Sequence, residues 1–245
     1  MFMRIIQSEW LKFRKSNIWL LLFVSPALAA LIGFFNADPN IKGFAWLHLL
    51  SAMLFVHGLL FLPLLTGIFS AFVSRYEHQG GGWKQLLALP VSRMQVYLAK
   101  GTIVMTFLAI TQFLFITAWY IVGSAKGISE VFPFAVACKI AIVGLIACLP
   151  LAALQLWVST AWASFAAPLA INVIFTMPNI LVANSEKYGP FYPWVQPFLT
   201  MLSVGGNGAV ENLFFIPIET LLYVVMGSFL AFMFGGILYF NRKPV

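Results

Sequence analysis

Six long apolar runs limit what this chain can fold into. They cover Ile18–Phe35, Phe44–Val73, Gly101–Gly123, Phe132–Trp157, Phe165–Ala183 and Pro217–Phe240. A helix needs about 20 mostly apolar residues to cross a bilayer, and backbone inside lipid must pair its polar groups internally. The runs are apolar on every face, whereas the strands of a membrane β-barrel alternate. The pattern predicts an all-α, polytopic membrane protein with six transmembrane helices forming one domain, residues 18–240.

The basic residues predict how the chain is oriented. Fourteen Lys and Arg stand against seven Asp and Glu, and the basic residues cluster at the ends of the runs. This clustering argues against a nucleic-acid partner, because no single soluble face is basic. Cytoplasmic loops are enriched in Lys and Arg. Ten of the fourteen fall inside if both termini are cytoplasmic, which predicts a multi-pass plasma-membrane protein with residues 75–100 and the tail 241–245 in the cytoplasm.

Residues 1–17 are expected to form an amphipathic interfacial helix. Aromatic and apolar side chains recur at helical spacing on one face, and basic or polar side chains recur on another. These are Phe2, Ile6, Trp10 and Phe13, and Arg4, Ser8, Lys12 and Lys15, respectively. Such a helix suits contact with anionic membrane lipid. The alternative is a positively charged flank that only orients the first span.

Residues 184–216 form the longest expected extracellular segment. Within them, Phe191–Leu202 is too apolar for a free loop and too short to span, and it is interrupted by Pro193 and Pro197. Irregular backbone at membrane depth is tolerated where protein or water covers it. We therefore expect a re-entrant or interfacial segment, partly buried over the outer end of the bundle.

The stretch Arg75–Lys100 lies between the second and third runs and is the best candidate for contact with a soluble partner. Ser92 and Gln95 form a capping box, and Val91 and Val96 are placed as its hydrophobic staple, which predicts a helix start near Arg93. Before it, residues 83–89 can form a short helix, which glycines 80–82 would separate from the second span. The short helix would lie across the inner end of the bundle.

This stretch resembles the first cytoplasmic loop of ABC-2 type transporter permeases. The resemblance rests on Glu77, Gly81, Gly82, Leu86, Leu87, the sequence LPVSR at residues 89–93, and Lys100. The N-terminal SEWLKFRKSNIW and the order of spans are also similar. In length and sequence pattern the chain is most similar to permeases of lantibiotic-immunity and bacitracin-resistance exporters. The glycine triplet departs from the usual Gly-Thr.

The resemblance implies a coupling helix that sits in a cleft of a separate ABC ATPase subunit. The residues implied in coupling are Glu77, Trp83, Lys84, Leu86, Leu87, Pro90, Ser92 and Arg93. Trp83 and Leu86 would be apolar anchors in the partner. The same resemblance implies two ATPase copies and a second permease, identical or homologous. The residues alone leave open a helix that rests on lipid headgroups.

No catalytic or metal-binding motif was found in the sequence. It lacks the Gly-x-x-x-x-Gly-Lys-Ser/Thr phosphate loop, the Gly-x-Ser-x-Gly elbow and the His-Glu-x-x-His zinc pair. Cys138 and Cys148 fall in the fourth run and are interpreted as small buried residues. We therefore expect no enzyme activity and no cofactor on this chain, with ATP and Mg on the partner ATPase.

Polar residues within the runs are sparse. His57, Gln155 and Asn172 are candidates for a cargo path, because a polar residue in a membrane span is often functional. The alternative is a hydrogen bond between helices. The sequence thus predicts the permease subunit of an ATP-driven exporter for a hydrophobic or amphipathic cargo, such as a peptide antibiotic or a lipid-linked molecule. The alternatives are a secondary transporter or channel, and a non-transporting scaffold or sensor.

Overall fold

The computed structural model describes residues 2–14, 16–41, 43–79, 81–205 and 217–243, and these residues form helices and turns without a strand. The helices are α1 (Phe2–Phe13), α2 (Ile18–Asn36), α3 (Ala45–Val56), α4 (Leu62–His78), α5 (Gly82–Leu87), α6 (Arg93–Ala125), α7 (Phe134–Ala161), α8 (Ala166–Thr176), α9 (Asn179–Ala183), α10 (Gln196–Gly205) and α12 (Ile218–Arg242). A π-helical turn, His57–Phe61, joins α3 to α4, and a short 3-10 helix covers Gly189–Phe191.

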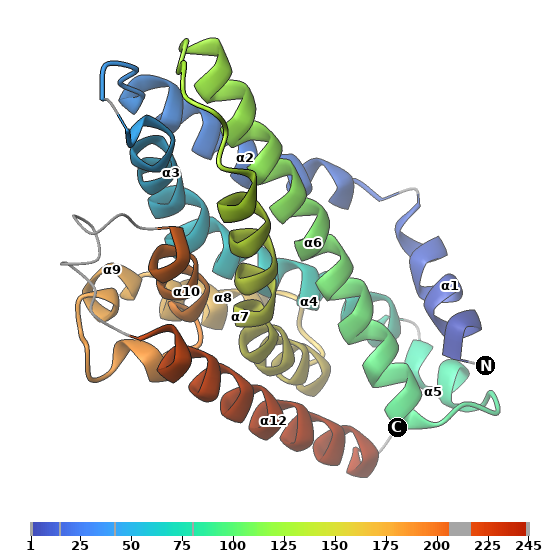
Figure 1. Cartoon of the computed structure of the whole chain (residues 1–245). Coiled ribbons are helices and arrows are strands. Elements are labelled where there is room, and N and C mark those ends of the chain that lie inside the picture. The colour runs from blue at the N-terminus through green and yellow to red at the C-terminus, as the bar shows by residue number, and fades with distance from the viewer. Residues whose placement is uncertain (1, 15, 42, 80, 206–216, 244–245) are drawn as a thin grey trace.

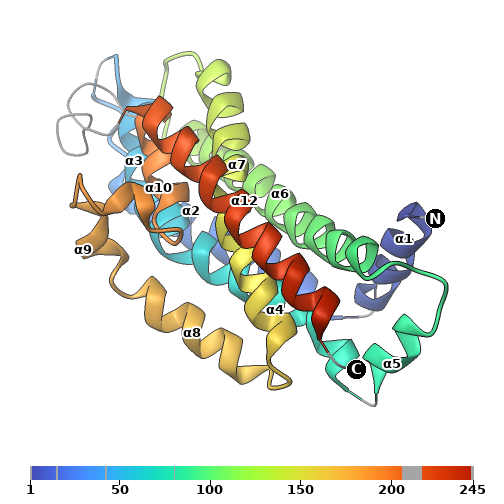
Figure 2. The ribbon, with the colours of Figure 1, turned by 90° about the horizontal axis from the view of Figure 1, so that it is seen from below.

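Five helical rods are long and apolar enough to cross a membrane. They are α2, the continuous rod Ala45–His78 that includes α3 and α4, α6, α7 and α12. The chain is therefore an all-helical, multi-pass membrane protein, as the apolar runs predict. Both termini lie at the same end of the bundle as α5 (Figures 1 and 2). We call this the α5 end; the α2–α3 and α6–α7 connections lie at the opposite end.

The fifth apolar run differs from the single spanning helix that we expected. It is divided into α8 and α9 by Met177 and Pro178. Pro178 has no N–H to continue the helix and its ring disfavours helix continuation. With 11 residues, α8 is about 16 Å long, which is about half of a hydrocarbon core of about 30 Å. The prediction missed this break because it weighed the length of the run above the proline within it.

The segment after α9 returns into the bundle as α10. This helix packs against α7, α3 and α12 (Figure 2), and its residues from Gln196 to Leu202 are buried. Of the expected re-entrant segment 184–216, residues 206–216 lie outside the described residues, and its extracellular position stays a prediction. The turn between α7 and α8 covers residues 162–165.

The N-terminal helix packs on protein along most of its apolar face. Ile5, Glu9 and Phe13 are buried, and α1 contacts α6. Phe13 meets Phe107 of α6 edge to face at a centroid distance of 5.5 Å. The face that we assigned to lipid is thus largely covered by the bundle, because aromatic side chains of α1 and α6 pack together there.

Candidate functional site

Two glycines place α5 close against the end of α4. Gly81 has φ +74°, a left-handed conformation that favours glycine. A Cβ on Gly82 would lie 2.8 Å from the Cα of Glu77, which no side chain tolerates. The glycine-rich departure from the family pattern therefore has a structural reason here: it lets the chain turn sharply from α4 into α5.

The inner face of α5 packs on this chain's own core. Trp83 is only 6% exposed, and its ring lies 5.0 Å from that of Phe240 at the end of α12. Its indole N–H donates to Nδ1 of His78 at 3.3 Å. We expected Trp83 and Leu86 to be anchors in a partner. In this structure Trp83 packs within the chain and Leu86 is half-buried against the same cluster, and their contact with a partner stays a prediction.

The outer face of α5 and the following turn are open. Lys84, Gln85, Ala88, Leu89 and Pro90 are exposed and define what we call the outer face of α5. Leu87 is half-buried at its edge. Among the five, Leu89 is the large apolar side chain, at 55% exposure. A partner at the α5 end would meet this surface rather than the tryptophan.

The start of α6 confirms the capping pattern of the sequence. The Ser92 hydroxyl accepts the backbone N–H of Gln95 at 3.2 Å, and Val91 packs with Val96 in one apolar cluster. Arg93, which the resemblance implies in coupling, makes its hydrogen bonds within the chain in this structure. Its guanidinium donates to carbonyl oxygens at the end of α12, those of Phe240, Asn241 and Lys243, at 3.0, 3.1 and 2.6 Å.

Four charged side chains meet beneath α5, and we call them the charge cluster: Glu9, Lys12, Glu77 and Lys100. Lys100 of α6 donates to Glu9 of α1 at 2.9 Å, to Glu77 of α4 at 2.7 Å and to the carbonyl oxygen of Val73 at 2.7 Å. Lys12 pairs with both carboxylates from the other side. The charge cluster therefore ties α1, α4 and α6 together.

The charge cluster is internally balanced. Two carboxylates face two ammonium groups, so its formal charge is zero, which burial of ions requires. Burial alone would lower the pKa of Lys12, but the charges and hydrogen bonds of Glu9 and Glu77 outweigh it and hold this pKa above 10.5. Lys100 also lies 5.5 Å from the centre of the Trp83 ring. The charge cluster and the inner face of α5 are thus in direct contact.

Glu77, which the resemblance implies in coupling, lies in the charge cluster, and its role toward an ATPase stays a prediction. Lys12 was assigned to the basic side of the N-terminal helix and Lys100 to the resemblance, and neither was expected to pair with Glu9. A signal for Glu9 was present, because it lies midway between Ile5 and Phe13 at helical spacing and these two are buried. An acidic residue on the apolar stripe of a helix indicates a buried ion pair.

The candidate cargo-path residues lie inside helix packing. His57 is fully buried; its Nδ1 lies 2.7 Å from the Ser25 hydroxyl and its Nε2 lies 2.9 Å from Oε1 of Gln112. Since the amide oxygen can only accept, Nε2 carries the proton and Nδ1 accepts from Ser25. His57 therefore links α2, the π-helical turn and α6, as the helix-packing interpretation expects.

Gln155 and Asn172 belong to a second buried group, which we call the amide network: Gln155, Asn172, Asn179 and Trp194. Asn172 Oδ1 accepts from Gln155 at 3.1 Å and from the Trp194 indole at 2.8 Å. Its Nδ2 donates to the carbonyl oxygens of Pro63 and Leu64, each at 3.1 Å. In this conformation the side chains join helices rather than face an open path.

The amide network also supplies a hydrogen-bond donor to the backbone near Pro63. Proline has no N–H, so Pro63 leaves the carbonyl of Leu59 without its usual helical donor. Asn179 Nδ2 donates to this carbonyl at 2.7 Å. Gly67 lets α8 approach, because a Cβ there would lie 2.2 Å from Nδ2 of Asn172. The broken fifth run is thus held to α4 by amide side chains.

Comparison with protein-family models matches residues 5–179 to the ABC-2 family transporter protein model. The match spans well over half of the chain and includes α5 and the charge cluster. The chain belongs to the ABC-2 transporter family. It is thus a membrane transport component, and ATP hydrolysis is not its own activity; membership implies association with an ABC ATPase. Comparison with curated proteins gave no match.

Proposed function

We propose that this ABC-2 family permease transmits movement of a separate ABC ATPase through α5. The proposal rests on the placement of α5: one face is open, and the other is attached to the bundle in two ways. The outer face would enter a cleft of the ATPase, which holds ATP and Mg. Two ATPase subunits and two permeases, identical or homologous, would complete the transporter in the plasma membrane, with both termini and the α5 end in the cytoplasm.

The attachment of α5 explains how a small displacement would reach the spans. Trp83 contacts Phe240 and so couples α5 to α12. On its other side the Trp83 ring lies near Lys100, which is paired to α1 and α4 through the charge cluster. Packed interfaces transmit displacement because they deform little. A push on the outer face would therefore move α12 and the α1–α4–α6 group together.

The composition of the spans supports an apolar or amphipathic cargo. The 25-residue α12 has few residues buried inside the chain, and Tyr223, Leu230 and Phe234 on it are large and exposed. Such faces suit lipid, an amphipathic cargo or a second permease. We infer export of a peptide antibiotic or lipid-linked molecule, by resemblance to lantibiotic-immunity and bacitracin-resistance exporters. Resistance of cells that express the chain with its ATPase, compared with either alone, tests this inference.

Leu89→Asp tests the coupling surface. Leu89 is exposed, so its loss should leave the permease folded, while a carboxylate at the apolar centre of the outer face should weaken ATPase association. Central interface residues contribute about 2 kcal/mol or more, which corresponds to about a 30-fold loss of affinity. The measurement is co-purification with the cognate ATPase and the ATPase rate that the permease stimulates.

Val131→Asp is the matched control, because Val131 is an exposed apolar residue at the opposite end, at 92% exposure. It should leave both readouts unchanged. Equal ATPase association for Leu89→Asp, Val131→Asp and the unchanged chain would reject α5 as the coupling surface. Transport without any ATPase would instead support a secondary transporter or channel, and ATPase binding without transport would support a sensor.

A further inference from the structure

A small cavity at the α5 end lies between α4, the end of α7 and the start of α8. Its volume is about 100 Å³, and its polar lining side chains are Arg75, His78, Gln79, Ser159 and Ser164. The wall is completed by Ala71 of α4, by Ala163 and Phe165 of the turn before α8, and by Pro168 of α8. Figure 2 shows α8 beside the lower part of α4, on the side of the bundle away from α1. The cavity is therefore separate from the charge cluster and from the outer face of α5.

Ser159 is an unsatisfied polar group in this wall. Its side chain is 2% exposed, and its hydroxyl has no hydrogen-bond partner among the described residues. A buried hydroxyl without a partner is costly, and such groups are rare in native proteins. Ser159 lines the cavity, so a ligand that accepts a hydrogen bond from its hydroxyl would satisfy this group.

Arg75 is an exposed cation in the lining of this cavity. Arg75 has a stacking contact, with its guanidinium carbon 5.3 Å from the centre of the Phe165 ring, and no ion pair to a residue that the structure describes. The residue that α8 contributes to the lining is Pro168, which has no backbone N–H, so the positive charge at the cavity comes from Arg75. A guanidinium is typical of sites for planar or tetrahedral oxyanions.

The remaining lining side chains do not cancel this positive charge. His78 uses both ring nitrogens: Nε2 donates to the carbonyl oxygen of Ser159 at 2.8 Å, and Nδ1 accepts from Trp83. The imidazole is therefore held neutral by its partners. None of the lining residues carries a carboxylate, and the nearby Glu77 is paired with Lys12 and Lys100.

We propose that this cavity binds one phosphate group, with Arg75 as its cation and Ser159 as a buried donor. The phosphate is either that of a membrane-lipid headgroup or a soluble phosphate. The position of the cavity at the ends of α4 and α7 favours the lipid, because this is where spans meet the headgroup region. The nearby aromatic pair Phe72 and Phe165 suits the same depth.

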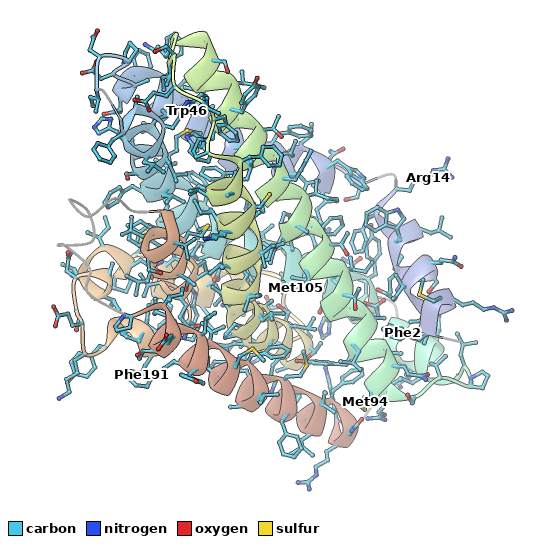
Figure 3. All side chains as sticks on the ribbon, viewed as in Figure 1. Phe2, Arg14, Trp46, Met94, Met105 and Phe191 are labelled. Carbon is cyan, nitrogen blue, oxygen red and sulfur yellow. The ribbon has the colours of Figure 1, made fainter. Side chains whose placement is uncertain are left out.

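Native mass spectrometry of the detergent-purified full chain tests the proposal with three probes: phosphatidylglycerol, diacylglycerol with the same acyl chains, and inorganic phosphate. Phosphatidylglycerol should bind and diacylglycerol should not. Arg75→Gln should weaken phosphatidylglycerol binding about tenfold and Ser159→Ala about fivefold, as expected for a charged and a neutral hydrogen bond. Arg14→Gln is the control, because Arg14 points away from the bundle (Figure 3).

The three probes distinguish the phosphate of a lipid headgroup from a soluble phosphate. If inorganic phosphate binds with the same dependence on Arg75 and competes with the lipid, the ligand is a soluble phosphate. If it neither binds nor competes, the ligand is a headgroup. Equal binding of diacylglycerol and phosphatidylglycerol, or equal affinity of Arg75→Gln and Arg14→Gln, overturns the proposal. Ser159→Ala retains the helix packing of α7, so the test remains decisive if Arg75→Gln does not fold.

Discussion

The charge cluster and the amide network are both buried and both join several helices, yet they use different chemistry. The charge cluster consists of two carboxylates and two ammonium groups at the α5 end. The amide network consists of neutral side chains between α4, α7, α8 and the segment before α10. Lys12 of the charge cluster retains 26% side-chain exposure, whereas Gln155, Asn172 and Asn179 of the amide network are at most 1% exposed.

The comparison teaches how the position in a bundle selects polar groups. Each buried ion carries a desolvation cost of several kcal/mol, which only close counter-charges offset. The charge cluster meets this condition at the ends of helices, where Lys12 still contacts water. Neutral amides cost less to bury when their hydrogen bonds are made. They are therefore suited to the inner positions, where they pair with carbonyls near Pro63 and the π-helical turn.

Lys100→Met should have the largest effect in either group. It leaves Glu9 and Glu77 with Lys12 as their shared counter-charge, and it removes the donor to the Val73 carbonyl. Removing one partner from a buried ion pair costs about 3–5 kcal/mol. The measurement is the free energy of unfolding of the detergent-solubilised chain by equilibrium denaturation.

The double variant with Lys100→Met and Glu77→Gln sharpens this prediction. It restores a one-to-one balance between Glu9 and Lys12, so it should be more stable than Lys100→Met alone. If the two substitutions are simply additive, the charges of the cluster do not interact, and the contrast with the amide network loses its basis.

Asn172→Leu should have the next largest effect. It leaves the donors of Gln155 and Trp194 without a partner and frees the carbonyls of Pro63 and Leu64 from a side-chain donor. Each unsatisfied buried group costs about 1–3 kcal/mol, so the two unpaired donors are expected to lower the free energy of unfolding by at least about 2 kcal/mol. Asn184→Leu is the matched control, because its amide bonds only the Ile180 carbonyl in an exposed place. A similar loss for both would show that the network adds no stability.

Alkaline pH should produce the smallest effect, and only in the charge cluster. The pKa of Lys12 is raised above 10.5 in the folded chain. Its contribution to stability is therefore fully present below 10.5 and is lost as the pH rises through the folded pKa. The free energy of unfolding should be constant from about pH 7 to 9. Above pH 10.5 it should fall by about 1 kcal/mol or less.

Two variants, measured in the same pH series, show whether Lys12 causes the loss of stability at alkaline pH. Lys12→Met should flatten the decline in stability above pH 10.5. Lys84→Met, which removes an exposed lysine of α5, should leave the decline unchanged. A decline that is identical in all three chains would mean that Lys12 is not responsible for it.

Local sequence chemistry predicted much of the α5 end. The Ser92 side chain caps the start of α6, and the short helix after the glycines forms, because the causes of both lie within a few residues. The packing of Trp83 against Phe240 was not predicted. Helical spacing groups Trp83 with Leu86 but does not say whether that face meets a partner or the end of α12. The hydrogen bonds of Arg93 were not predicted for the same reason, since its acceptors are about 150 residues away in sequence.

Long apolar runs, basic flanks and turn residues determined on their own that this chain is an all-helical membrane protein with a short helix between its second and third runs. The reason is that solvation of a backbone and formation of a capped helix depend on neighbouring residues. Only the tertiary structure decided that the charges of Glu9, Lys12, Glu77 and Lys100 meet, and that Asn179 replaces the donor that Pro63 lacks. Burial and pairing depend on which helices pack together, and this packing is set by residues that are far apart in sequence.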